Sequence, residues 1–112
     1  MYIYTMNYKK QIDNIFSTRS IYKSLIVCHD NFIMLKLYHY MRYDNYPVAN
    51  ISELDKFRAN NCRILFIDHI DYKNIEKLLE PSDIEMINAI FFVGCDSYPM
   101  FKDDNLKYYV IQ

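Results

Sequence analysis

The sequence predicts an α/β fold: a single three-layer domain over residues 1–112, with a mostly parallel sheet of about five strands and helices on both faces. Three short apolar runs, at residues 24–28, 63–67 and 90–94, are rich in Ile, Val, Leu and Phe, which is typical of strands buried on both faces. Helical patterns separate these runs, and strands separated by helices form right-handed parallel crossovers. Residues 1–20 are the part whose structure the sequence predicts least.

The first helix is expected directly after the first apolar run. Asp30 can cap it, since Asp is favoured before the first helical turn, and the helical pattern continues to about Tyr43. The side chains spaced for its apolar face are Ile33, Leu37, Tyr40 and Met41. The side chains of the opposite face are Lys36, His39 and Arg42.

A second strand and a short helix are expected next. The stretch NYPVANI, residues 45–51, predicts a strand with Pro47 at its start, where a missing N–H does least harm. Ser52 and Asp55 have the spacing of a capping pair for a short helix. The side chains that this helix would turn inward are Leu54 and Phe57.

A longer helix is expected after the third strand, over DYKNIEKLLE, residues 71–80. Its apolar face carries Ile75, Leu78 and Leu79. Pro81 should stop this helix, and Ser82 with Glu85 then forms a capping box for a further turn or two before the fourth strand. The stretch LKYYVIQ, residues 106–112, predicts a fifth strand.

Length and composition exclude several classes of protein. Hydrophobic residues make up 52% and charged residues 24% of the 112, which excludes a disordered chain, and no apolar run approaches the roughly 18 residues of a membrane span. A domain of this size can fold without disulfides or metal, and we expect no cofactor. The amino-terminal stretch lacks the pattern of a secretory signal, and three cysteines cannot all pair, so we expect a soluble protein that is cytoplasmic or otherwise intracellular.

The charge and codon bias bear on partners and origin. The net charge is −1, with Lys and Arg scattered along the chain, so charge does not favour nucleic acid as a direct ligand but does not exclude it, and contact through a complex is compatible with the sequence. Phe, Ile, Lys, Asn, Tyr and Met account for 59 of the 112 residues. All six have A- and T-rich codons, which indicates an AT-rich genome such as that of a large DNA virus, an organelle, a protist or a low-GC bacterium.

Chemically active side chains follow three of the expected strands. Ligands bind at the carboxyl ends of strands in open parallel sheets. The residues expected at that edge are Cys28, His29, Asp30, Asp68, His69, Cys95 and Asp96. Cysteine, imidazole and carboxylate are zinc ligands, and the same groups can form a Cys nucleophile with a His base. Two carboxylates at the ends of the first and third strands can also begin a magnesium site, as in a receiver-like domain.

The same residues have a purely structural explanation. Asp30, Asp68 and Asp71 are residues that cap a following helix, and Cys28 and Cys95 are small enough to belong to the core. No CxxC or HxxxH spacing supports a metal, and adjacent residues of an extended chain point to opposite faces.

Three segments resemble parts of the second RecA-like domain of superfamily 2 helicases over residues 23–99. KSLIVCHDN is similar to its first strand and turn, LDKFRANNCRILFID to its helix and R-I-L strand, and SDIEMINAIFFVGCDSYP to the following D-I…V…P stretch. Asp68 and His69 replace the threonine that follows the R-I-L strand in the family, and no glycine-rich turn or Q-x-x-G-R-x-G-R segment is present. The resemblance therefore implies a helicase-like scaffold without ATP-driven activity, and no catalytic residue is carried over.

Two functions fit these observations. The first is a non-catalytic interaction subunit that docks on itself, as a homo-oligomer, or on a larger assembly such as replication, transcription or virion machinery. Tyr108 and Tyr109, in the expected last strand, are then its candidate interface residues. The alternative is a small cysteine- or metal-dependent enzyme that uses Cys28, His29, Asp68, His69 and Cys95. The missing catalytic motifs favour the first function.

Overall fold

A five-stranded parallel sheet forms the centre of the molecule, with the strand order β2-β3-β1-β4-β5. The computed structural model describes residues 2–59, 62–94 and 106–112. The strands are β1 (Ser24–Cys28), β2 (Val48–Asn50), β3 (Ile64–Asp68), β4 (Ala89–Val93) and β5 (Lys107–Ile111). The predicted α/β fold is therefore confirmed, and all four strand pairs are parallel.

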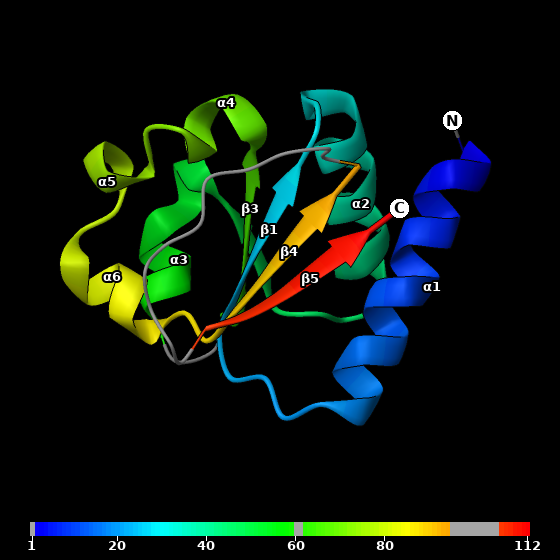
Figure 1. Ribbon diagram of the computed structural model, residues 1–112, viewed down its shortest axis with the longest axis horizontal. Coiled ribbons are helices and arrows are strands. Elements are labelled where there is room, and N and C mark those ends of the chain that lie inside the picture. The colour runs from blue at the N-terminus through cyan, green and yellow to red at the C-terminus, as the bar shows by residue number, and fades with distance from the viewer. Residues whose placement is uncertain (1, 60–61, 95–105) are drawn as a thin grey trace.

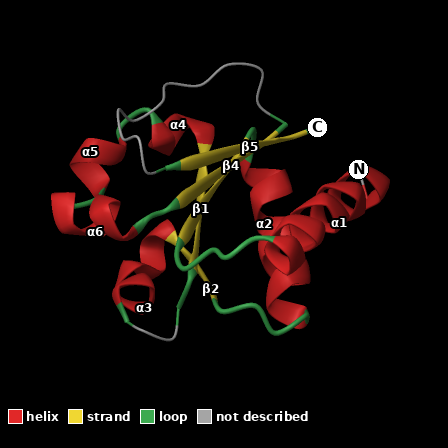
Figure 2. Cartoon of the chain, turned by 60° about the horizontal axis from the view of Figure 1, so that its bottom comes forward, coloured by secondary structure: helices red, strands yellow, loops and turns green. Residues whose placement is uncertain are grey.

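Helices cover both faces of the sheet (Figure 1). The helices on one face are α1 (Tyr2–Thr18) and α2 (Asn31–Tyr43). The helices on the other face are α3 (Leu54–Arg58), α4 (His69–Tyr72), α5 (Ile75–Leu78) and α6 (Pro81–Met86), with a 3-10 turn at Ile51–Glu53 before α3. Figure 2 shows the two helical layers on either side of the strands.

The core consists of two clusters because successive strand residues point to opposite faces of the sheet. Leu25 and Val27 of β1 pack into the cluster under α3–α6, together with Phe57. Ile26 and Cys28 pack into the cluster under α1 and α2. The central strands β1 and β4 are buried along their whole length, as their continuous apolar runs predict.

Helix α2 has the predicted cap but a somewhat different inner face. Asp30 accepts a hydrogen bond from the backbone N–H of Ile33 at 2.8 Å. The buried side chains of α2 are Met34, Leu37, Tyr38 and Met41. The prediction that Ile33 and Tyr40 belong to this face is only partly right, since both are half-buried at its border.

The predicted helix over residues 71–80 is wrong in its extent. It is divided into α4 and α5, and α4 already begins at His69 because Asp68 caps it. After α5 the backbone becomes extended at Leu79, which turns that side chain into the core and leaves Leu78 partly exposed. No Pro or Gly lies between the two helices, and the side chains of Tyr72, Ile75 and Leu79 are all buried in the core on this face of the sheet.

Two predicted caps are displaced. Pro81 begins α6 instead of ending the preceding helix, which agrees with its preference for the first helical position. The backbone N–H of Glu80 donates to Asp83 at 3.0 Å, so the cap precedes the predicted Ser82–Glu85 box. Similarly, Asn50 and Glu53 form the cap that was predicted at Ser52 and Asp55.

Residues near the amino terminus form helix α1. An ion pair and a hydrogen bond connect this helix to the end of α2 and to the residues after it. Lys9 is buried and forms ion pairs with Asp13 at 2.8 Å and with Asp44, the residue that follows α2. Tyr46 donates a hydrogen bond to Asp13 at 2.7 Å. Within the described part of the chain, no helix has the length and apolarity that a membrane span requires.

A buried lysine ties the amino ends of the strands to α3. Lys23, directly before β1, is 1% exposed. Its ammonium donates to the carbonyl oxygens of Phe57, Ala59 at 3.2 Å and Cys62 at 3.0 Å, and lies 4.7 Å from the centre of the Phe57 ring. These carbonyls lie at the end of α3 and in the turn after it, so Lys23 supplies hydrogen bonds that this helix end lacks.

Candidate functional site

The carboxyl ends of β1 and β3 lie side by side, as the sequence predicts. Cys28 pairs in register with Asp68 on one side and with Val93 of β4 on the other. The chain leaves β1 toward α2 on one face of the sheet and leaves β3 toward α4 on the opposite face (Figure 1). Such a reversal between neighbouring strands opens a crevice where ligands bind in doubly wound α/β folds.

Both aspartates at this edge act as helix caps. Asp30 caps α2, and Asp68 accepts a hydrogen bond from the backbone N–H of Asp71 at 2.8 Å, which caps α4. The capping interpretation of Asp30 and Asp68 is confirmed. One carboxylate oxygen of each side chain is therefore committed to a backbone donor, which reduces what either could offer a metal ion or a substrate.

The cysteines of the described chain are buried thiols. Cys28 is fully buried in the cluster under α1 and α2, which argues against a nucleophile at this position. Cys62 is also buried, and this burial raises the pKa of its thiol. Cys95 and Asp96, the predicted contribution of the fourth strand, lie outside the described residues.

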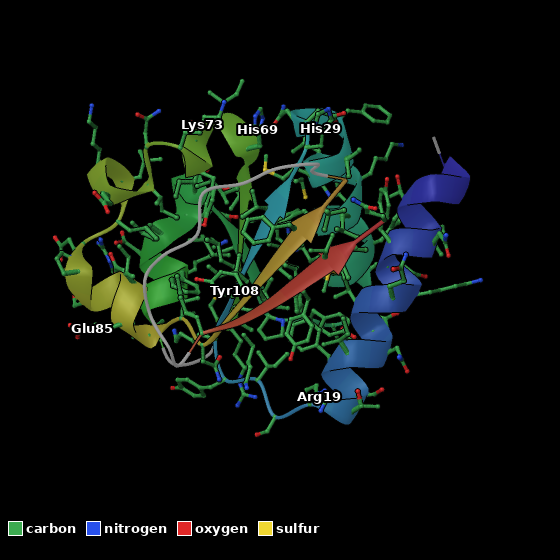
Figure 3. The ribbon with its side chains drawn as sticks, viewed as in Figure 1. Arg19, His29, His69, Lys73, Glu85 and Tyr108 are labelled. Atoms are coloured by element: carbon green, nitrogen blue, oxygen red, sulfur yellow. The ribbon has the colours of Figure 1, made fainter. Side chains whose placement is uncertain are left out.

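The two histidines are the predicted site residues that the fold brings together. Their ring centres are 5.9 Å apart and their planes differ by 26°. His29 is exposed and His69 is half-buried, and Figure 3 shows both at the same end of the sheet. Two imidazoles in this arrangement can donate to or accept from one bound molecule, or move a proton to or from it.

Helix α1 adds a residue that the sequence analysis missed. Gly94, directly after β4, has a φ of +67°, a conformation that glycine adopts most readily. A Cβ atom at this position would lie 3.4 Å from the Tyr8 hydroxyl and 3.5 Å from the His29 Cβ. The phenol of Tyr8 thus lies at the same strand end, and no local pattern in the first 20 residues indicates this placement.

A metal centre finds no support in the described part of the chain, where no group of three or more His, Cys, Asp or Glu side chains could hold an ion. The two carboxylates that might begin a magnesium site are those that cap α2 and α4. Of the predicted site residues that the structure describes, the imidazoles of His29 and His69 are therefore the groups left to interact with a ligand.

The predicted interface tyrosines lie on the edge strand β5 and are half-buried. Tyr109 packs edge-on against Phe91 at 5.0 Å, and Tyr108 stacks on Phe92 at 6.2 Å. These contacts hold the two rings on opposite faces of the sheet. Their role in an interface stays a prediction.

A second surface, which the sequence analysis assigned only as the polar face of a helix, runs along the outside of α2. Phe32 is 47% exposed and Tyr43 is 87% exposed. Lys36 and His39 lie between them at helical spacing and are exposed too. We call Phe32, Lys36, His39 and Tyr43 the α2 ridge.

A groove of about 510 Å³ between α1 and α2 adjoins the α2 ridge. The residues that line it are Met6, Lys9, His39, Tyr40, Tyr43 and Asp44. Its ionic groups, Lys9 and Asp44, pair with each other. The groove therefore offers mainly apolar and aromatic surface beside a ridge that carries the Lys36 ammonium.

Comparison with known proteins identifies no relative: no family model, curated protein or solved structure matches the chain.

Proposed function

We propose that this protein is a small non-catalytic α/β module that docks on a protein partner through the α2 ridge. The observation that supports this is the exposure of Phe32 and Tyr43 at the two ends of one helix face, beside an apolar groove. Large aromatic side chains are enriched at the centres of protein interfaces and uncommon on surfaces that meet only water.

The charge of the ridge indicates what partner it fits. Helix α2 contains no acidic residue, and its outer side carries Lys36, His39 and Arg42. The Lys36 ammonium lies 5.6 Å from the Phe32 ring centre, so charge and apolar surface are combined. Two copies of the ridge placed face to face would repel each other, which favours a different protein with an apolar and acidic surface.

The catalytic alternative is less well supported because two of its five residues, Cys28 and Asp68, have structural roles, and Cys95 lies outside the described residues. Cys28 is buried, and the carboxylates of Asp30 and Asp68 cap helices.

The composition and the resemblance of residues 23–99 support two further proposals: an AT-rich, viral source, and a helicase-like scaffold within replication, transcription or virion machinery.

Affinity capture with a ridge variant tests the docking proposal. The wild-type chain should retain one partner in stoichiometric amount from its own source, and the F32S/K36E/Y43S variant should lose that same partner. A control variant, K77E/L78S, changes an exposed lysine and a partly exposed leucine on α5 and should retain it. Reconstitution with the purified partner should give a defined complex, whereas retention by the ridge variant would contradict the proposal.

The His29–His69 pair favours a second candidate function, binding or proton transfer at the switch between β1 and β3. The test follows the imidazole NMR signals during titration with zinc and with small anions. A ligand held between the rings should shift both signals together and should lose affinity in H29N and in H69N. Signals that do not respond, or that respond singly, would remove this candidate.

A further inference from the structure

A basic and aromatic surface lies at the opposite end of the sheet, along the amino ends of the strands. Three exposed cations lie there among the described residues: Arg19 after α1, Arg63 directly before β3 and Lys107 at the start of β5. None of the three forms an ion pair within the described part of the chain. We compared these cations with the carboxylates in the described segments that link the end of a helix to the start of a strand. Asp44 is the acidic residue of those segments, and it forms an ion pair with Lys9. Among the described residues of these segments, cations therefore outnumber carboxylates, although the whole chain carries a net charge of −1.

Tyrosine rings accompany these cations. Arg19 and Lys107 line a pocket of about 260 Å³ together with Tyr108 and Tyr109. The Arg63 guanidinium lies 5.8 Å from the ring centre of Tyr22, which is about half exposed. Figure 3 shows Arg19 and Tyr108 in the lower half of the molecule, away from His29 and His69.

The strand order sets the spacing of this surface. Strands β3, β1, β4 and β5 are neighbours in that order, so three interstrand steps of about 4.8 Å place the start of β3 roughly 14 Å from the start of β5. Tyr22 precedes β1, which lies between them. The groups along the edge are thus Arg63, the Tyr22 ring, and then Arg19 and Lys107 beside the Tyr109 ring, while Tyr108 lies on the opposite face of the sheet.

We infer that this edge binds single-stranded nucleic acid over two or three nucleotides. Phosphates contact Arg63, Arg19 and Lys107, and a base enters the pocket against Tyr109, whose ring lies on the α1 side of the sheet, as Arg19 does. Alternating cations and aromatic faces are what sequence-tolerant binding of a single strand requires, because every phosphate is an anion and every base has a π-face. The net charge of the chain does not reveal such a surface, because it sums over all residues regardless of where the fold places them. The inference does not depend on the α2 ridge.

Fluorescence anisotropy of the full chain with a fluorescein-labelled dT 12-mer tests the inference between 20 and 150 mM NaCl. Three phosphate contacts predict a slope of about −2 for log Kobs against log salt, at about −0.7 per contact. R19Q/K107Q leaves one phosphate contact, so the slope should become shallower, about −0.7, and binding should weaken at least about tenfold at the lowest salt. R63Q, made separately, should make the slope shallower by about 0.7. This variant tests the inference independently if the double variant does not fold.

Three comparisons complete the test. The charge-matched control K73Q/K77Q changes exposed lysines of the turn after α4 and of α5, and should keep the wild-type slope and an affinity within about twofold. An abasic 12-mer should bind at least about fivefold more weakly, since base stacking on an aromatic ring is lost. A U 12-mer shows whether RNA is preferred to DNA. Absence of binding at 20 mM salt, an equal loss in the control, or displacement by polyglutamate as effective as by unlabelled dT 12-mer would overturn the inference.

Discussion

Replacement of Lys23 by methionine should destabilise the protein more than any other single lysine change in its described part. The methionine keeps most of the aliphatic stem of the lysine but removes an ammonium that donates to the carbonyls of Phe57, Ala59 and Cys62. These partners are 34 to 39 residues away in the sequence, so the lysine connects the start of β1 to the end of α3.

The expected loss in the free energy of unfolding of K23M follows from two opposing contributions. A hydrogen bond from a charged donor contributes about 1.5–3 kcal/mol, so three such bonds contribute roughly 4–9 kcal/mol. Removal of the ammonium also relieves the desolvation penalty of a buried ion, which amounts to several kcal/mol. Because the three carbonyls would remain buried without a donor, we expect a net loss of about 3 kcal/mol. At roughly 4 °C per kcal/mol for a chain of this size, Tm should fall by about 12 °C.

Urea denaturation followed by circular dichroism measures this loss. The matched control is K77M, which makes the same chemical change at an exposed position of α5 and should alter the free energy of unfolding by less than about 0.5 kcal/mol. If K23M unfolds within about 0.5 kcal/mol of the wild type, the three hydrogen bonds do not stabilise the fold as argued.

Three other predictions concern capping and pH. D30A and D68A should each lower the free energy of unfolding by about 1 kcal/mol and D30N by less, in the same urea assay; unchanged stability in both would contradict their role as caps. Arg58 beside Asp83 lowers the pKa of that buried carboxyl, so its stabilising contribution is present above about pH 4 and is lost as the pH falls through the lower folded-state pKa. D83N should therefore be less stable than the wild type at pH 7, and the difference should close in acid; a constant difference would refute the ion pair. Burial and a hydrogen bond to a carboxylate raise the pKa of Tyr46 to about 12, so stability present below about pH 10 should be lost toward pH 12. Y46F should flatten this alkaline limb, and an unchanged limb would show that another group causes it.

The strands could be predicted from the sequence because their signal is local. A continuous apolar run as short as residues 90–94, rich in Ile, Phe and Val, has the length and composition of a strand buried on both faces rather than of a helix. Asp30 and Asp68 could be predicted as caps for the same reason, since each lies directly between an apolar run and a helix. Parallel strands then place the two histidines at one edge without knowledge of the register.

The structural features that could not be predicted from the sequence depend on contacts between segments that are far apart in the chain. Helix α1 has weak apolar periodicity and is held in part by the ion pair between Lys9 and Asp44, 35 residues apart in the sequence. Residues 71–80 are divided between two helices with no Pro or Gly between them, and the role of Lys23 depends on carbonyls of α3. The candidate surfaces are of this kind too: the helical pattern identifies the outer side of α2, but only the structure shows that Tyr43 is exposed next to a groove.

The measurement that tests the central claim most directly is a native mass spectrum of the chain, purified without added metal or chelator and mixed with its captured partner. The account predicts a metal-free mass and a defined complex that the F32S/K36E/Y43S variant cannot form. A stoichiometric excess mass that matches zinc, lost on acidification and absent from H29N/H69N, together with an unaffected complex of the ridge variant, would contradict it. That result would make the imidazole pair, rather than the α2 ridge, the functional centre of the protein.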